Sequence, residues 1–147
     1  MEKKEQVDIV VVGSGPGGYA AAFRAADLGN DVLLIDRDRE LGGVCLNRGC
    51  IPSKALLHIS KVMEEASEVS RAGVSFGEPV IDLDAVRKYK DRIVSHLNGG
   101  IAQLAKARKV KTIKATVSFR SNKELIAKTD LGETPILFNK CIIAAGS

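Results

Sequence analysis

The chain has 147 residues, of which 45% are hydrophobic and 27% are charged, and this predicts one soluble domain that buries a core without disulfide or metal staples. The net charge is +4, but 18 acidic residues are mixed with 22 basic ones, and the densest basic run, 106–114, holds no aromatic residue that could stack on a base. We therefore expect no nucleic-acid partner, and, because no apolar segment is long enough for a membrane span or a secretion signal, a cytoplasmic protein.

The amino-terminal part of the chain predicts a βαβ unit. An almost purely apolar run is typical of a strand in a parallel sheet that is covered on both faces, and the alanine-rich segment after it contains no helix breaker. A second short apolar run then closes the unit. We place the first strand at 7–12, the helix at 19–28 and the second strand at 31–35.

A Gly-x-Gly-x-x-Gly motif joins the first strand to the helix. Gly13 permits the tight turn, Gly15 lets the backbone approach a pyrophosphate, and Gly18 allows close helix packing. The helix amino terminus adds N–H groups for the phosphates, and Asp36 ends the second strand, where a carboxylate can accept hydrogen bonds from ribose hydroxyls. The pattern predicts a dinucleotide site. Arg37 and Arg39 could pair with a 2′-phosphate, so NADP is kept as an alternative ligand. A second alternative is that the glycines only tighten a turn and bind no nucleotide.

Cys45 and Cys50 lie in a glycine-rich segment, 41–50, which we predict to be a loop. A helix predicted at 52–66 places Cys50 at a helix amino terminus, where the dipole favours a thiolate. Two cysteines at this spacing in a reducing compartment indicate thiol–disulfide exchange. The alternatives are two unrelated buried thiols or a metal half-site, for which the third cysteine and both histidines lie at unsuitable spacings.

The rest of the chain predicts one long amphipathic helix and then short strands. Asp82 caps the helix, which runs to about Arg108 with a weak point at 99–100. Its apolar positions are Leu83, Val86, Ile93, Leu97, Ile101 and Leu104. We expect strands at 110–119, 123–128, 136–138 and 141–144, with a turn at 130–133. The expected fold is α/β: a Rossmann-like domain with a parallel sheet, flanking helices and a small antiparallel β-meander. Because the chain stops soon after a strand, we expect a longer polypeptide.

Residues 42–57 closely resemble the redox-active segment of the pyridine nucleotide–disulfide oxidoreductases. Within that family, the Leu-Asn at 46–47 and the Ile-Pro-Ser-Lys at 51–54 resemble the dihydrolipoamide dehydrogenases rather than the glutathione reductases. Residues 142–147 resemble the second FAD-contacting segment of the family. The resemblance runs essentially from Val7 to the end, so residues 1–147 are expected to be the amino-terminal part of an FAD-binding domain.

The resemblance also implies roles for single residues. Cys50 would lie against the flavin, Cys45 would exchange with a lipoyl disulfide, and Lys54 would approach the flavin ring. The main chain near Val117 would contact the adenine. The family usually has Glu at position 36 and often Gly at position 117, so this chain departs from the pattern at both. Cofactor contacts are implied at Gly13, Gly15, Gly18, Asp36, Arg37, Gly43, Val44, Cys45, Lys54, Val117 and Gly146.

The implied activity is the oxidation of dihydrolipoyl groups, with electrons passing through the cysteine pair and FAD to NAD. The implied partners are the lipoyl-bearing acyltransferase of 2-oxo acid dehydrogenase complexes or the glycine cleavage carrier. The family's NAD-binding, central and dimerisation domains are missing here, so a homodimer is expected only of the full-length protein. The alternatives are a related disulfide or mercuric reductase, and a nucleotide-binding or interaction module whose cysteines are idle.

Overall fold

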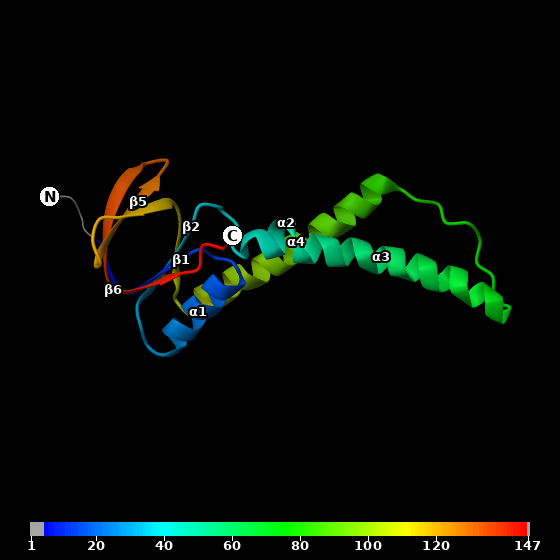
Figure 1. The fold of residues 1–147 in the computed structure, drawn as a ribbon, viewed down its shortest axis with the longest axis horizontal. Coiled ribbons are helices and arrows are strands. Elements are labelled where there is room, and N and C mark those ends of the chain that lie inside the picture. Colours follow the sequence, from blue (N-terminus) through cyan, green and yellow to red (C-terminus); the bar gives the residue numbers. More distant parts are fainter. Residues whose placement is uncertain (1–4, 147) are drawn as a thin grey trace.

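A computed structural model describes residues 5–146, and Figure 1 shows a sheet from which a long pair of helices extends. Ser147, which belongs to the predicted FAD-contacting segment, and residues 1–4 lie outside the described part. The elements in chain order are β1 (Glu5–Val12), α1 (Pro16–Asp27), β2 (Val32–Asp36), α2 (Gly43–Arg48), α3 (Cys50–Glu68), the 3-10 helix η1 (Val69–Ala72), α4 (Leu83–Ala107), β3 (Lys111–Lys114), β4 (Thr116–Phe119), β5 (Glu124–Thr129) and β6 (Gly132–Ile143).

The strands form one sheet of six strands in the order β3-β2-β1-β6-β5-β4. The strands β3, β2, β1 and β6 run parallel, whereas β5 is antiparallel to both β6 and β4. The first strand is central, as predicted, with Val10 paired to Leu33 on one side and to Cys141 on the other. The predicted α/β fold, with a parallel sheet and an antiparallel meander, is confirmed.

The core divides between the two faces of this sheet, because successive side chains along a strand point to opposite faces. Val11 and Leu34 face helices α1 and α4, whereas Val10 and Leu33 face the meander. On the helical side the buried partners include Ala22, Phe23, Leu46, Ile101 and Ala105; on the other side they include Ala115, Leu125, Ala127, Ile136 and Phe138. Both faces of the central strands are therefore covered.

Two of the predicted strand boundaries are wrong. The single strand expected at 110–119 is divided at Ala115 into β3 and β4, which lie at opposite edges of the sheet. The amide of Ala115 donates to the carbonyl oxygen of Asp36 at 2.8 Å, which ends the pairing along β2. The two strands expected at 136–138 and 141–144 are one continuous strand, β6, because it pairs with β5 in its first half and with β1 in its second.

The predicted helix after Asp82 is confirmed as α4. The Asp82 carboxylate accepts from the amides of Asp84 and Ala85 at 2.9 and 3.1 Å, and the helix continues through 99–100 without a break. Its apolar stripe is only partly buried, since Leu83, Leu97 and Leu104 are exposed while Ile101 is in the core. In Figure 1 the amino-terminal part of α4 runs with α3 away from the sheet, whereas its carboxyl-terminal part lies beside α1. No helix within residues 5–146 is both long and apolar enough to cross a membrane.

Candidate active site

A cleft of about 260 Å³ opens where the carboxyl ends of β1, β2 and β6 meet. Ligands of open parallel sheets bind at this edge, because the loops that follow the strands converge there. The cleft brings together predicted cofactor residues from four separate segments: Gly13, Gly15, Asp36, Arg37, Gly43, Val44, Cys45 and Gly146. Pro16, Asp38, Ala144 and Ala145 complete its lining.

The three motif glycines differ in what surrounds them. Gly13 has a φ of 99°, and a Cβ there would lie 2.2 Å from the carbonyl oxygen of Ala144. A Cβ on Gly18 would lie only 1.7 Å from the carbonyl oxygen of Gly13, so this residue lets α1 pack against the turn and does not itself line the cleft. A Cβ on Gly15 would meet nothing within 4 Å, so no protein atom covers that side of its backbone.

The amino end of α1 opens into the same cleft. Gly15 is its N-cap residue, Pro16 is in its first turn, and no side chain caps this end. The first N–H groups of a helix have no partner within the helix, and the positive end of the dipole lies beside them. This end of α1 is therefore suited to an anionic group such as a pyrophosphate.

Asp36 is held in place by a buried hydroxyl that the sequence motif does not single out. Its Oδ2 accepts from the Ser14 amide at 2.6 Å and from the Ser14 hydroxyl at 2.7 Å, and its Oδ1 accepts from the Asp38 amide at 2.9 Å. A carboxylate has about four acceptor sites, so capacity remains for a ribose hydroxyl. Ser14 is fully buried, and its position between two motif glycines is the one signal that could have indicated it.

These contacts set the charge state of Asp36. Burial by itself would raise the pKa of this carboxyl. The hydrogen bonds from the Asp38 amide and from the Ser14 hydroxyl and amide, together with the charge of Arg37, outweigh burial and hold the pKa of the carboxyl below its ordinary value of 3.8. The folded protein therefore favours the carboxylate over the protonated acid.

The Ser14→Ala substitution should lower the free energy of unfolding by about 2 kcal/mol at pH 7, because one hydrogen bond to a charged group is lost. The folded-state pKa of Asp36 is depressed, so its stabilising contribution is present above the pKa of an unfolded Asp, about 3.9, and is lost as the pH falls through the folded-state pKa. The variant should accordingly lose less stability than the parent below about pH 4. Urea unfolding at several pH values measures both effects; Ser67→Ala, at an exposed position on α3, is the control, and equal acid dependence in parent and Ser14→Ala would contradict the assignment.

A second hollow, of about 190 Å³, adjoins the cleft and shares Gly13, Asp36 and Arg37 with it. Val117 lines this hollow, next to Thr116 on β4. The sequence-predicted adenine position and the sequence-predicted ribose position therefore lie in one depression. A planar base that entered here would have its ribose beside Asp36.

The cysteine segment was predicted as a loop, and that prediction is wrong, because 43–48 form the short helix α2. Gly42 and Gly43 take positive φ values of 104° and 61°, and this turn starts the helix. A Cβ on Gly43 would lie 2.7 Å from the Cα of Gly15, so the two glycine-rich turns contact each other through backbone alone. Cys45, on α2, is half-buried and lines the cleft.

The other cysteine lies on the next helix. Cys50 is the first residue of α3, as the predicted helix amino terminus required, and its side chain is exposed. Gly49 precedes it, and a Cβ on Gly49 would lie 3.6 Å from the Cα of Cys45, so the two cysteine-bearing backbones are adjacent. Lys54, also on the first turns of α3, is exposed; neither it nor Cys50 lines the cleft.

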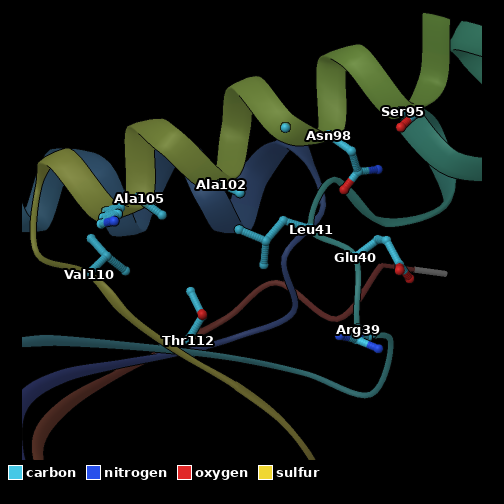
Figure 2. Close-up of a pocket in the computed structure, with 11 residues that line it drawn as sticks. Arg39, Glu40, Leu41, Ser95, Asn98, Ala102, Ala105, Val110 and Thr112 are labelled. Atoms are coloured by element: carbon cyan, nitrogen blue, oxygen red, sulfur yellow. The ribbon is translucent and has the colours of Figure 1, made fainter. Parts of the chain in front are cut away.

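A larger hollow, of about 580 Å³, lies between α4 and residues 39–41. Figure 2 shows its lining, with Ser95, Asn98 and Ala105 on α4 and Leu41 and Glu40 across from them. It contains no cysteine and none of the motif glycines. A hollow larger than the cleft therefore holds none of the predicted site residues, and it is the convergence of those residues that identifies the cleft.

Comparisons with known proteins agree with this geometry. The family model described as pyridine nucleotide-disulphide oxidoreductase matches residues 7–147. The chain is 48% identical over 147 residues to the dihydrolipoyl dehydrogenase of Vibrio cholerae and 49% identical over 148 residues to that of Haemophilus influenzae, covering 100% of this chain in each case. It is 46% identical over 143 residues to dihydrolipoyl dehydrogenase 3 of Haloarcula marismortui, covering 95% of this chain. The chain spans about 31% of the length of the first two relatives and 30% of the third.

Proposed function

The chain belongs to the pyridine nucleotide–disulphide oxidoreductase family, and on this premise we propose that it is the FAD-binding part of an enzyme that oxidises protein-bound dihydrolipoyl groups. The observation that carries the proposal is the position of Cys45, which lines the same cleft as Gly13, Gly15 and Asp36 and lies beside the backbone that leads to Cys50. A dithiol/disulfide pair at the end of a dinucleotide cleft has a route for passing electrons to a bound cofactor.

Residues of the cleft would hold FAD along its length. Gly13, Gly15 and the amino end of α1 would bind the pyrophosphate, Asp36 the ribose, and the main chain at Val117 the adenine. The backbone of Gly15 is open to a ligand, and no side chain competes with phosphate at the amino end of α1, which supports the assignment. Bound FAD would supply the acceptor of two electrons from the cysteine pair.

The side chains Arg37, Val44 and Lys54, and the backbone at Gly43 and Gly146, would complete the cofactor contacts. Arg37 and Val44 line the cleft, as do both glycines. Lys54 is exposed four residues beyond Cys50 on α3 and would approach the ring of a bound flavin. The Asp36 carboxylate, which accepts a hydrogen bond from the Ser14 hydroxyl, is negatively charged. A negative charge at this position favours a free ribose hydroxyl over a 2′-phosphate.

The cysteine pair would carry out thiol–disulfide exchange. One thiolate of the dihydrolipoyl group attacks Sγ of Cys45 in the oxidised pair, which breaks the Cys45–Cys50 bond and releases Cys50 as a thiolate at the amino end of α3. The second lipoyl thiol attacks its own half of the mixed disulfide, which releases Cys45 and closes the lipoyl disulfide. The pair gains two electrons, and the two thiol protons pass to base or solvent.

We infer that NAD is the final electron acceptor and that its site lies outside these residues, since the relatives are about three times as long as the chain. The dithiol substrate would be carried on a lipoyl-bearing acyltransferase of 2-oxo acid dehydrogenase complexes or on the glycine cleavage carrier. The complete protein would act as a homodimer in the cytoplasm.

The visible absorption spectrum tests this proposal. The polypeptide that carries these residues is supplied with FAD and titrated anaerobically with a dithiol. We expect flavin bands and, on reduction, a new long-wavelength charge-transfer band, because a Cys50 thiolate would lie against the flavin ring. Bound flavin without that band would contradict the role of the cysteine pair. Tighter binding of NADP than of FAD would contradict the cofactor.

A further inference from the structure

The helix that carries Cys45 has little stability of its own. Helix α2 has six residues, Gly42 precedes it, Gly49 follows it, and no side chain caps its amino end. Helices this short are not stable in isolation, because the cost of nucleation exceeds the few hydrogen bonds formed. Contacts with the rest of the protein must therefore fix where α2 lies, and with it the position of Cys45.

The main polar anchor of α2 is Asn47. Its Nδ2 donates to the carbonyl oxygens of Leu41 at 3.2 Å and Gly43 at 3.0 Å, which fixes the turn that starts the helix. Its Oδ1 accepts from Nδ2 of Asn98 on α4 at 2.5 Å, across 51 residues of sequence. Both ends of the Asn47 amide are therefore used, one within the cysteine segment and one to a different helix.

Asn98, the partner of Asn47, lies on a helix that is packed into the core. Asn98 is half-buried and leaves α4 on the side that faces Leu41 and Glu40 (Figure 2). Ile101, one turn further along α4, is buried in the same core cluster as Leu46 of α2. The other polar contact of α2 is an ion pair at the surface between the exposed Arg48 and the half-buried Asp38, and ion pairs at the surface contribute little.

We propose that Asn98 is a positioning residue for the redox pair: through Asn47 it holds α2 so that Cys45 stays beside Cys50 at the start of α3. The close approach of Gly49 to the Cα of Cys45 is the arrangement that this anchor preserves. Without the anchor α2 samples more positions, and the effective concentration of one sulfur at the other falls. The inference rests on the proposed function, because it concerns the same cysteine pair.

The test is the equilibrium constant for forming the Cys45–Cys50 disulfide in the polypeptide that carries these residues. The protein is equilibrated with glutathione at different ratios of disulfide to thiol, trapped by alkylation and analysed by mass spectrometry. In this reaction two cysteine thiols lose two electrons and two protons, and one glutathione disulfide becomes two glutathione thiols. Asn98→Ala should lower the constant about fivefold, the effect of one net hydrogen bond, which corresponds to a shift of about 20 mV.

The control is Gln103→Ala, which removes an exposed amide side chain from the same helix and should leave the constant unchanged. The double variant Asn47→Ala/Asn98→Ala should match Asn47→Ala alone, since the hydrogen bond from Asn98 is already lost when Asn47 is replaced. If Asn98→Ala does not fold, Asn98→Asp keeps the side-chain size, lacks the amide hydrogens and should show the same fall. A constant equal to that of the parent, or effects of the two substitutions that add, would overturn the proposal. If the parent itself forms no Cys45–Cys50 disulfide at any ratio, it is the proposed function that fails.

Discussion

Replacing Cys45 or Cys50 with Ser should reduce the oxidation of dihydrolipoamide by the complete protein on the order of 10⁴-fold, because a serine hydroxyl can neither form nor resolve a disulfide. The two single variants and the double variant should be equally inactive, since the residues act as one unit. Bound FAD should be retained in all three, because serine is close to cysteine in size and the glycines and Asp36 of the cleft are unchanged. The measurements are NAD reduction and the flavin content of the purified protein.

Cys141→Ser provides the matched control for these cysteine variants. Cys141 is half-buried on β6, and burial raises the pKa of its thiol, so this sulfur stays protonated and unreactive at neutral pH. We expect the variant to keep full activity. Activity that survives in Cys45→Ser or Cys50→Ser would instead show that the pair is idle.

Gly18→Ala should destabilise the fold by about 3 kcal/mol, at the upper end for an overpacked site. The added Cβ would lie 1.7 Å from the carbonyl oxygen of Gly13. The Cβ position is fixed by the helix backbone, and the carbonyl belongs to the backbone of the turn, so neither group can rotate away. The amino end of α1 must therefore move off the turn, and the anion site between Gly13 and Gly15 is distorted at the same time. We expect FAD binding to be lost together with stability. Denaturant unfolding and flavin content measure the two effects.

Gly17→Ala is the control one residue away. Gly17 also lies in the first turn of α1, but a Cβ there has nothing within 4 Å, and alanine is the better helix former. We expect unchanged or slightly increased stability, by roughly 0.5 kcal/mol. If the two variants lose equal stability, the packing of α1 against the turn does not explain the motif.

The structural predictions that depend on a few neighbouring residues were confirmed. The βαβ unit, the cap at Asp82 and the place of Cys50 at a helix amino terminus follow from runs of a few residues, and the structure contains all three. Ser14 and Asn47 were not predicted as site residues. Each lies within a motif that was recognised, but its partner, Asp36 or Asn98, is 22 or 51 residues away.

The errors in the strand predictions have the same origin. The segment 110–119 contains no glycine or proline and alternates apolar and polar residues from Ile113 onward, so the local pattern predicts one strand. In the structure β3 pairs with β2, whereas β4 pairs with β5 at the far edge of the sheet. The opposite error made two strands of β6, since Asn139 and Lys140 interrupt its apolar run while its backbone pairing continues past them. The helix α2 was likewise predicted as a loop, because glycines at 42, 43 and 49 are typical of loops.

Local sequence was enough to establish the fold class and to predict a dinucleotide turn and a reactive cysteine pair, because glycine freedom, helix capping and hydrophobic runs act over short distances along the chain. The position of Cys45 in the cleft, the contact of Ser14 with Asp36 and the contact of Asn98 with Asn47 of α2 appear only in the folded chain. These contacts depend on which backbone segments the sheet and the helix pair bring within hydrogen-bonding distance. Burial of the whole core determines that arrangement, and no single segment of the sequence specifies it.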